Sequence, residues 1–394
     1  MKIAIVNVQE FNPQIGGVER VSVSLARELI QLGVDVIFIA RRRSPYSKNY
    51  VLPATQYILS DSSDYSPRCV EEVIKIIRDE KVDILLNQNA HSYDFNRECE
   101  EIKIRTGVKL VSSLHFCPDM RIRANRNMID FRFFSISRNI IYLLKDICTR
   151  FPFSLITMYP HRKQFRHLYN VSDKIVLLSE TFKKSFSDIA CIQIDSRVCA
   201  INNMLSFDLQ EDFLYKNKRK QILFCGRLTE QKNPQRVLYV WGQIHNLIKD
   251  WELVILGDGP LSLRMQQLCS RMKLPRVKFE GFRSPVDYYK ESSIYLMTSN
   301  YEGWGLSLTE AMQFGCIPIV FRSYSSVSDI IDSGYNGFLI EPFSINAMSD
   351  CILKLVNNLD ADKISSLARK KTEDFIPSKL CKQWLDLFNK LISD

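Results

Sequence analysis

Short apolar runs alternate with amphipathic stretches along the whole chain. The apolar runs have the length of buried strands, and the stretches between them repeat their apolar residues at helical spacing. This alternation predicts parallel strands joined by crossover helices, which is an α/β fold. In the first half we expect strands at Lys2–Val8, Asp35–Ala40, Asp83–Asn87, Lys109–Leu114 and Lys174–Leu178, and helices at Val18–Gln31 and Pro67–Glu80.

A second series of the same kind follows the polar stretch Asp208–Lys220, which carries charges of both signs. Its expected strands are Gln221–Cys225, Glu252–Leu256, Val277–Glu280, Ile294–Thr298, Ile317–Phe321 and Gly337–Ile340. Its expected helices are Pro234–Ile248, Leu261–Met272, Leu306–Phe314 and Val327–Ser333, with several more after Ser344.

Two similar halves predict two doubly wound, Rossmann-like domains that face a cleft. We expect the N-terminal domain at residues 1–205 and the second domain at residues 206–376. Residues 377–394 form an amphipathic helix that we expect to pack back towards the N-terminal domain. In such sheets ligands bind beyond the carboxyl ends of the strands, so chemistry is sought in the loops there.

Composition excludes several classes of protein. With 394 residues and 46% hydrophobic content, the chain is neither disordered nor a small disulfide scaffold. No apolar run reaches the roughly 18 residues of a membrane span, and we interpret the N-terminus as a first strand rather than a signal peptide. The eleven cysteines include no Cys-x-x-Cys pair, which favours reduced thiols in a cytoplasmic protein.

The net charge of +9 is concentrated in residues 121–170. Two aspartates oppose ten basic residues there, which are Arg121, Arg123, Arg126, Arg132, Arg138, Lys145, Arg150, Arg162, Lys163 and Arg166. Aromatic and aliphatic residues such as Phe131, Phe133, Phe134 and Tyr142 lie among them. This mixture predicts an interfacial helix on an anionic membrane surface. The alternative is a core-packing helix with solvated arginines. No nucleic-acid-binding motif accompanies the stretch, so we expect no nucleic acid partner.

In each half of the chain, a glycine-containing loop follows the first predicted strand. In the first half, Gly16 and Gly17 stand just before a predicted helix, where free N–H groups and the helix dipole favour an anion. The alternative is that the two glycines only form a tight turn between the strand and the helix. In the second half, Arg227 and Lys232 project from the loop after Gly226. Two cations at a strand end can clamp a diphosphate, although they can also be ordinary surface charges.

The most specific pattern is two glutamates eight residues apart, Glu302 and Glu310, around a helix start at Leu306. Eight residues of helix span about 12 Å, comparable to the reach from a nucleotide's sugar substituent to its ribose. Gly303 and Gly305 leave the N–H groups at the helix start open to phosphate. Carboxylates suit sugar hydroxyls because each accepts two hydrogen bonds. The alternative is one capping and one solvated glutamate.

These motifs together resemble the GT-B glycosyltransferases, specifically the retaining, family-4-like group. The resemblance covers nearly the whole chain. It rests on the loop from Gly16 to Arg20, the Gly226-Arg227…Lys232-Asn-Pro loop, Gly257-Asp-Gly-Pro260, Phe279-Glu-Gly281, Glu302-x7-Glu310 and Gly337-Phe-Leu. One segment departs from the family pattern, because Arg322-Ser-Tyr-Ser-Ser326 stands where a glycine pair is common.

The resemblance implies roles for matching residues. Arg227 and Lys232 would bind the diphosphate of the donor and stabilise it as it leaves. Glu310 would hold the ribose hydroxyls, and Glu302 would contact the transferred sugar. The donor would be a UDP- or GDP-linked sugar, with no cofactor and no metal.

Four further residues acquire expected roles in the same way. Gly16 and Gly17 would approach the phosphates or the acceptor. His115, at the end of its strand, would lie near the reacting sugar, unless it is a structural histidine. Phe282, with the two residues after it, would line the base pocket.

The implied function is transfer of a sugar, with retention, to a glycan or lipid-linked acceptor. Bacterial surface polysaccharide or lipopolysaccharide synthesis, peripheral on the inner face of the cytoplasmic membrane, is the expected setting. A nucleotide-sugar 2-epimerase of the same fold would leave the basic stretch unexplained. A non-enzymatic sugar-binding protein would have no use for the Arg227 and Lys232 pair.

Overall fold

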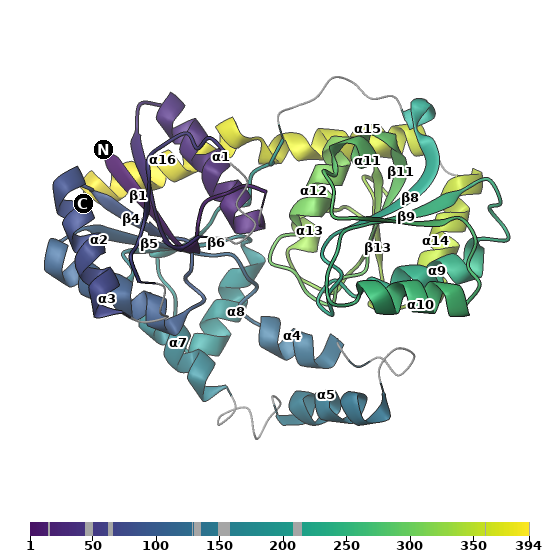
Figure 1. Cartoon of the computed structure of the whole chain (residues 1–394), viewed down its shortest axis with the longest axis horizontal. Coiled ribbons are helices and arrows are strands. Elements are labelled where there is room, and N and C mark those ends of the chain that lie inside the picture. Colours follow the sequence, from purple (N-terminus) through teal and green to yellow (C-terminus); the bar gives the residue numbers. More distant parts are fainter. Residues whose placement is uncertain are drawn as a thin grey trace. The chain divides into compact units, whose positions relative to one another are not determined.

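The computed structural model describes residues 1–14, 16–43, 50–61, 66–127, 129, 135–148, 158–207, 215–358 and 360–393. The chain forms two compact units (Figure 1). The first comprises Met1–Asp119, Ser154–Ser206 and Phe375–Asp394, and the second comprises Met120–Phe153 and Phe207–Asp374.

The first unit contains a parallel sheet of seven strands in the order β3-β2-β1-β4-β5-β6-β7. Its strands are β1 (Lys2–Gln9), β2 (Asp35–Arg42), β3 (Gln56–Ile58), β4 (Ile84–Asn87), β5 (Lys109–Leu114), β6 (Lys174–Leu177) and β7 (Val198–Ala200). The central strands are buried on both faces, which is why they read as continuous apolar runs.

Helices pack on this sheet. Those that connect its strands are α1 (Gly17–Gln31), α2 (Pro67–Glu80), α3 (Tyr93–Thr106), α7 (Tyr159–Val171) and α8 (Thr181–Ala190), and the C-terminal α16 (Pro377–Ser393) joins them from the end of the chain. Local sequence sets their ends: Ser66 caps α2 and is followed by Pro67, and Ser92 caps α3. Helices α2 and α3 share one apolar core with the sheet, and α16 packs against α1 (Figure 1).

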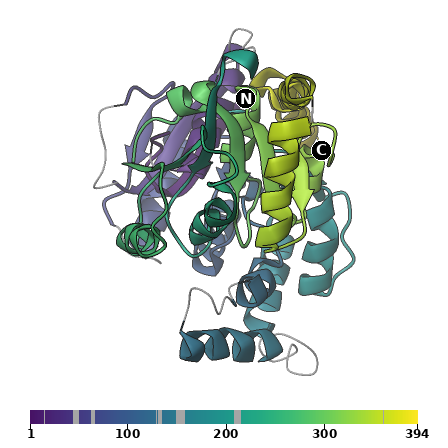
Figure 2. The same cartoon turned by 90° about the vertical axis from the view of Figure 1, so that its right-hand side faces the viewer.

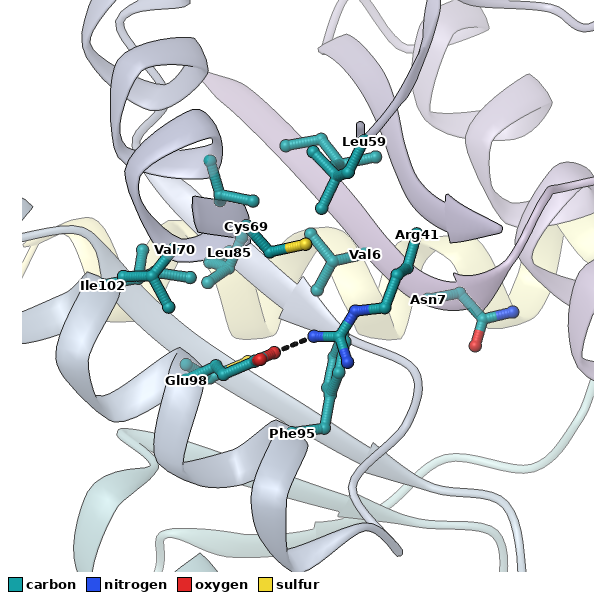
Figure 3. A pocket seen from close by; sticks show the side chains of 13 residues that line it. Val6, Asn7, Arg41, Leu59, Cys69, Val70, Leu85, Phe95, Glu98 and Ile102 are labelled. Carbon is teal, nitrogen blue, oxygen red and sulfur yellow. Dashed lines mark hydrogen bonds and ion pairs between the residues drawn. The ribbon is translucent and has the colours of Figure 1, made fainter. Parts of the chain in front are cut away.

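A small internal cavity of about 20 Å³ lies between the sheet and helices α2 and α3 (Figure 3). Its wall includes an ion pair between Arg41 and Glu98, whose side chains are only 3% and 4% exposed. Burial raises the pKa of Glu98, although the Ser66 N–H and Arg41 act in the opposite direction. The cavity has room for about one water molecule, and we assign it a structural role.

The second unit contains a parallel sheet of six strands in the order β10-β9-β8-β11-β12-β13. The strands are β8 (Arg219–Cys225), β9 (Glu252–Leu256), β10 (Val277–Gly281), β11 (Ser292–Met297), β12 (Ile317–Phe321) and β13 (Phe338–Ile340). The prediction of two doubly wound, parallel sheets is therefore confirmed.

The helices of the second unit that follow these strands are α9 (Gln235–Ile244), α10 (Ser262–Arg271), α11 (Val286–Glu291), α12 (Leu306–Gln313), α13 (Val327–Ile330), α14 (Ile345–Asn358) and α15 (Ala361–Thr372). Two short 3₁₀ turns, η1 (Tyr215–Asn217) and η2 (Glu373–Phe375), flank the series. Helices α9, α10 and α14 share one large apolar core with the sheet, whereas α12 and α15 pack against each other.

Within the described residues, the basic stretch contributes three helices, α4 (Met120–Asn127), α5 (Ile136–Cys148) and α7, which belongs to the first unit. Helices α4 and α5 pack against each other (Figures 1 and 2). We expected all of these residues within the N-terminal domain, but α4 and α5 belong to the second unit. The side chains of Arg121, Arg123 and Arg126 lie outside the described residues, as do Arg150 and the segment 130–134 with Arg132, Phe131, Phe133 and Phe134. Among the helices that the structure describes, none is long and apolar enough to cross a membrane.

Candidate functional site

The candidate site lies at the switch point of the second sheet. Strand β8 is the first strand in the sequence of this sheet, and it lies beside β11, so the chain winds in opposite directions on either side of this pair. The loops that follow these two strands, residues 226–233 and 298–305, leave the sheet at the same edge. Ligands of doubly wound sheets bind at this position.

The loop after β8 is held by the loop after β9. The Gly226 N–H donates to the carbonyl of Leu256 at 3.0 Å, and the Leu228 N–H donates to the carbonyl of Asp258 at 2.8 Å. Gly257 has a φ of +137°, and a Cβ there would lie 2.0 Å from the carbonyl oxygen of Gly226. The Gly257-Asp-Gly motif therefore allows the two loops to touch, which fixes the position of Arg227 and Lys232 along the edge.

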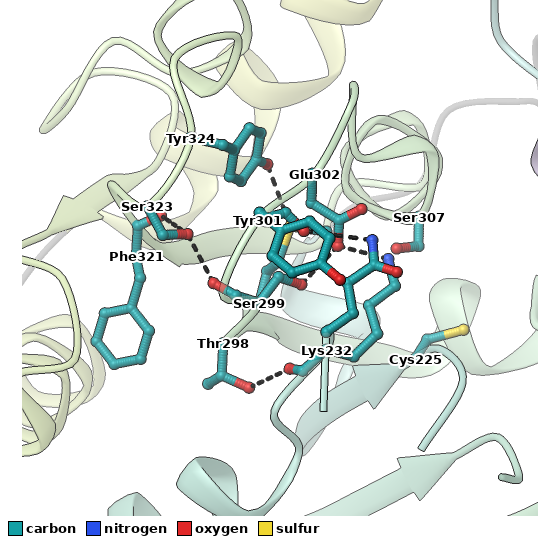
Figure 4. A network of polar contacts seen from close by, with 12 residues as sticks. Cys225, Lys232, Thr298, Ser299, Tyr301, Glu302, Ser307, Phe321, Ser323 and Tyr324 are labelled. Carbon is teal, nitrogen blue, oxygen red and sulfur yellow. Dashed lines mark hydrogen bonds and ion pairs between the residues drawn. The ribbon is translucent and has the colours of Figure 1, made fainter. Parts of the chain in front are cut away.

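Lys232 and Glu302 contact each other directly (Figure 4). The Lys232 Nζ lies 2.6 Å from Glu302 Oε1, and the Ser299 hydroxyl donates to the same oxygen at 2.6 Å. The side chains of Lys232 and Glu302 are 18% and 7% exposed. The sequence-predicted sugar-binding carboxylate and phosphate-binding cation thus form one ion pair from two adjacent loops.

The segment that departs from the family pattern supports the Glu302 loop. The Ser323 hydroxyl donates to the carbonyl of Ser299 at 2.6 Å, and the Ser326 hydroxyl donates to the carbonyl of Gly303 at 2.8 Å. Tyr324 (Figure 4) is fully buried, and its hydroxyl donates to the sulfur of Met297 at 3.2 Å. Side-chain hydrogen bonds from this segment therefore hold the Glu302 loop in place.

Helix α12 begins directly after this loop. Gly305 precedes it with a φ of +95°, and no side chain caps the first turn. A Cβ at Gly305 would lie 2.9 Å from the Tyr324 hydroxyl, so a larger residue would be both strained and crowded. The helix begins at Leu306, as the sequence predicts, with its N-terminal N–H groups directed towards the switch point.

Glu310 lies in the second turn of α12 and is 2% exposed. The Tyr289 hydroxyl donates to Glu310 Oε2 at 3.2 Å. Burial raises the pKa of Tyr289 well above its usual value of 10, so the phenol keeps its proton. Tyr289 thus helps to fix the orientation of the Glu310 carboxylate.

Replacing Glu310 by Ala is expected to weaken nucleoside diphosphate binding more than it lowers the turnover number. A ribose contact is the same in the ground state and the transition state, so its loss acts on affinity. Calorimetric titration with UDP measures the change. An unchanged affinity for UDP would contradict the ribose role of Glu310. Tyr289→Phe is a milder control, because it removes one hydrogen bond to Glu310 but keeps the carboxylate.

Two other predicted residues lie near the same edge but are open to solvent. Arg227 is exposed beside the buried Leu228. Phe282 is 77% exposed after β10, whereas Arg283 and Ser284 line a polar groove of about 430 Å³ beside β9 and β10. The predicted base-binding role of Phe282 stays a prediction.

The remaining predicted residues belong to the first unit. Gly16 precedes α1 and Gly17 begins it, with no side-chain cap. His115 follows β5, and its Nε2 lies 2.5 Å from Gln88 Oε1. A Cβ at Gly16 would lie 2.3 Å from Glu19 Oε2, so a carboxylate lies beside this helix start. The predicted role of Gly16 and Gly17, contact with the phosphates or with the acceptor, stays a prediction.

His115 is expected to stay neutral between about pH 5 and pH 8. Burial, and then the neighbouring His91, lower its pKa to about 3. An unfolded histidine has a pKa of about 6.5, so between these values the unfolded chain binds more protons and His115 makes stability rise with pH. A ¹⁵N NMR titration of the labelled histidine rings would show this, and a His115 transition near pH 6.5 would contradict it.

Sequence reasoning missed one connection to the site. Glu230, between Arg227 and Lys232, is ion-paired with Arg138 and accepts a hydrogen bond from Tyr142 at 2.7 Å. Asn300 is fully buried, and its side-chain amide donates to the Glu230 carbonyl at 2.7 Å. Both loops of the switch point are thus tied together, and α5 is fastened to one of them.

Two family models match the chain. The glycosyl transferases group 1 model matches residues 207–371, and the Glycosyltransferase Family 4 model matches residues 15–204. An uncharacterized glycosyltransferase of Haemophilus influenzae is 30% identical over 220 residues, 54% of this chain and 60% of that protein. The amylovoran biosynthesis glycosyltransferase AmsD of Erwinia amylovora is 24% identical over 229 residues, 56% of this chain and 63% of that protein. The chain thus spans about 60% of the length of these curated relatives.

The fold is also that of solved glycosyltransferase structures. Anabaena Alr3699/HepE, crystallised with UDP and glucose, superposes with a TM-score of 0.72 over 99% of this chain and 100% of that chain, at 15% identity. At that identity the likeness concerns the fold. The two family matches extend over most of the sequence, one for each Rossmann-like unit, and the chain belongs to the GT-B glycosyltransferases.

Proposed function

We propose that the protein transfers a hexose from a UDP-linked donor to a glycan or lipid-linked acceptor, with retention of anomeric configuration. The observation that carries the proposal is the Lys232–Glu302 ion pair at the switch point of the second sheet. It puts a cation and a carboxylate beside an uncapped helix start, where a diphosphate and its sugar would bind.

The ion pair accounts for both substrate contacts. When a donor binds, its diphosphate competes with Glu302 for the Lys232 ammonium group, because phosphate oxygens also accept charge-assisted hydrogen bonds. Glu302 is then available to hydroxyls of the sugar, while the hydrogen bond from Ser299 keeps it in place. The exposed Arg227 contributes the second positive charge.

Transfer breaks the bond between the anomeric carbon and the diphosphate oxygen, and the bonding electrons stay with the diphosphate. The acceptor oxygen bonds to the anomeric carbon on the same face, and its proton passes to the departing phosphate oxygen. Lys232, Arg227 and the N–H groups at the start of α12 stabilise the negative charge on the leaving group. Glu302 stabilises the positive charge on the sugar.

The donor and the setting are supported by the relatives. HepE was crystallised with UDP and glucose, and AmsD is a glycosyltransferase of amylovoran biosynthesis. By analogy we propose UDP as the donor nucleotide and bacterial surface polysaccharide or lipopolysaccharide synthesis as the process. The reaction would take place on the cytoplasmic side of the membrane.

A release assay tests the proposal. Purified protein is incubated with bacterial membranes and a panel of UDP- and GDP-linked sugars, and free nucleoside diphosphate is measured. We expect release from one UDP-sugar that depends on the membranes. No release from any donor, with a folded protein, would contradict the proposed function.

We further propose that α5 docks on an anionic membrane. Ile136, Ile140, Leu143, Leu144 and Ile147 form one stripe along the helix and are 42–71% exposed. The side that carries Arg138 and Tyr142 contacts Glu230 instead. An exposed apolar stripe within a stretch of strong positive charge has the properties of an interfacial helix.

Replacing Ile140 and Leu144 by Ser is expected to reduce sedimentation with anionic liposomes without unfolding the protein, because both side chains are exposed. Replacing Leu247 and Leu263 by Ser removes two leucines elsewhere in the second unit that are even more exposed, at 68% and 67%, and should leave sedimentation unchanged. Binding should also weaken with salt. Equal sedimentation of wild type with neutral and anionic liposomes, or with neither, would contradict the membrane proposal.

A further inference from the structure

Thr298, the residue that follows β11, holds the main chain of the segment that carries Lys232. Thr298 is fully buried. Its hydroxyl donates to the carbonyl of Lys232 at 3.2 Å (Figure 4) and to the carbonyl of Asn233 at 3.0 Å. A buried hydroxyl that is satisfied by two main-chain carbonyls of another loop fixes that loop relative to its own strand.

Asn300, two residues further along, holds the same segment in the same way. It is also fully buried. Its main-chain N–H donates to the carbonyl of Gln231 at 2.7 Å, and its side-chain amide donates to the carbonyl of Glu230 at 2.7 Å. Together with Thr298, it therefore supplies a hydrogen bond to each of the four consecutive carbonyls of residues 230–233.

Arg236 fixes the orientation of the Asn300 side chain. Its Nη1 donates to Asn300 Oδ1 at 2.8 Å, and a guanidinium group has no acceptor, so the amide nitrogen must face the Glu230 carbonyl. Arg236 is 2% exposed, and its guanidinium carbon lies 3.8 Å from the centroid of the Phe343 ring. This position requires an asparagine, because aspartate has no donor and leucine has neither donor nor acceptor.

These hydrogen bonds bear on the place of the Lys232 ammonium group. A lysine carries its charge at the end of a flexible four-carbon stem, so the position of the charge depends on where the main chain starts. Thr298 and Asn300 lie on the loop that also carries Glu302, whose Oε1 is 2.6 Å from the Lys232 Nζ. They thus hold the segment of the cation against the segment of the carboxylate.

We propose that Thr298 and Asn300 are positioning residues that set the place of Lys232 by holding the carbonyls of residues 230–233. Both side chains are buried and bonded to the protein, so they act through Lys232 rather than on a substrate. The consequence for a bound diphosphate rests on the proposed function, in which Lys232 contacts that group. The positioning itself concerns the ion pair with Glu302 and can be measured without a nucleotide.

The first test measures the coupling between Lys232 and Glu302 in the absence of any ligand. The free energies of unfolding of Lys232→Met, Glu302→Gln and the double variant isolate the pairwise interaction. The cycle is then repeated in Thr298→Val, which keeps the shape of the side chain but not its hydroxyl. We expect the coupling to fall by about half or more in that background, and to return in Thr298→Ser.

The matched control for this cycle is Ser293→Ala. Ser293 is 3% exposed, and its hydroxyl donates to the carbonyl of Arg219, but it is the second residue of β11 and lies at the amino end of the strand, away from the switch point. Its loss should destabilise the protein and leave the coupling as in the wild type. An unchanged coupling in Thr298→Val, or an equal loss in Ser293→Ala, would overturn the proposal.

The second test uses UDP and uridine as probes of the cation. The ratio of their affinities, measured by calorimetric titration, gives the contribution of the diphosphate. Thr298→Val and Asn300→Leu should lower this ratio about tenfold, whereas partial unfolding would weaken both affinities equally. Ser293→Ala should keep the ratio. If wild type prefers UDP and neither variant changes that preference, the proposal is wrong.

The two tests separate this inference from the proposed function. Thr298→Val carries both of them even if Asn300→Leu does not fold, because valine fills the same volume. A wild type that does not prefer UDP over uridine, with the coupling lost in Thr298→Val, would contradict the proposed diphosphate contact of Lys232. The positioning role of Thr298 would then still stand.

Discussion

Replacing Lys232 by Met is expected to lower the turnover number about 10²–10³-fold. The ammonium group would stabilise the charge that develops on the departing diphosphate, and Met keeps most of the aliphatic stem but not the charge. Because Lys232 also neutralises the buried Glu302 carboxylate, the same change should destabilise the folded protein by roughly 3 kcal/mol. Steady-state kinetics and chemical denaturation measure the two effects.

Arg227→Met separates catalysis from stability. Arg227 is exposed, so its loss should lower turnover while leaving the free energy of unfolding unchanged. Wild-type rates in both variants would show that these cations do not bind the diphosphate. A loss of rate in Lys232→Met that is fully explained by unfolding would also contradict the assignment.

Replacing Glu302 by Gln is expected to lower turnover on the order of 10²-fold, with a smaller effect on the affinity for UDP. The amide keeps the shape of the side chain but removes the negative charge that would face a cationic sugar in the transition state. Release of nucleoside diphosphate, measured over a range of donor concentrations, separates the turnover number from KM.

The matched control for this change is Glu252→Gln. Glu252 also forms an ion pair with a lysine, Lys278, but it lies at the first residue of β9, at the opposite end of the strands from the switch point. The control should keep wild-type turnover. Equal losses in the two variants would mean that the effect of Glu302→Gln is not specific to the site.

The fold could be predicted from the sequence because its strongest signals are local. Buried parallel strands are continuous apolar runs, and Ile317–Phe321 was predicted with the bounds that β12 has. The short β3 was missed because its residues, Gln56–Ile58, are only partly buried and carry no such run. The helix predicted at Val327–Ser333 is too long at its C-terminal end, because α13 ends at Ile330.

The placement of α4 and α5 could not be predicted for a different reason. Position along the chain puts them in the first half, whereas long-range contacts join them to the second unit. The Asn127 amide donates to the carbonyl of Asn300 at 2.6 Å, and Arg138 pairs with Glu230. Neither contact leaves a periodic pattern in the sequence.

The candidate site was partly predictable because its glycines and charges follow strands directly. The sequence indicated Lys232 and Glu302 separately, but only the structure brings them to 2.6 Å.

The central claim, that the protein transfers a sugar from a nucleotide donor, is tested most directly by following the sugar itself. A ¹⁴C-labelled UDP-hexose is incubated with membranes and protein, and label is measured in the lipid and glycan fraction for wild type and Glu302→Gln. The account predicts label in that fraction with wild type and much less with the variant. Label that stays in the donor or appears as free sugar, with none in the acceptor fraction, would contradict it.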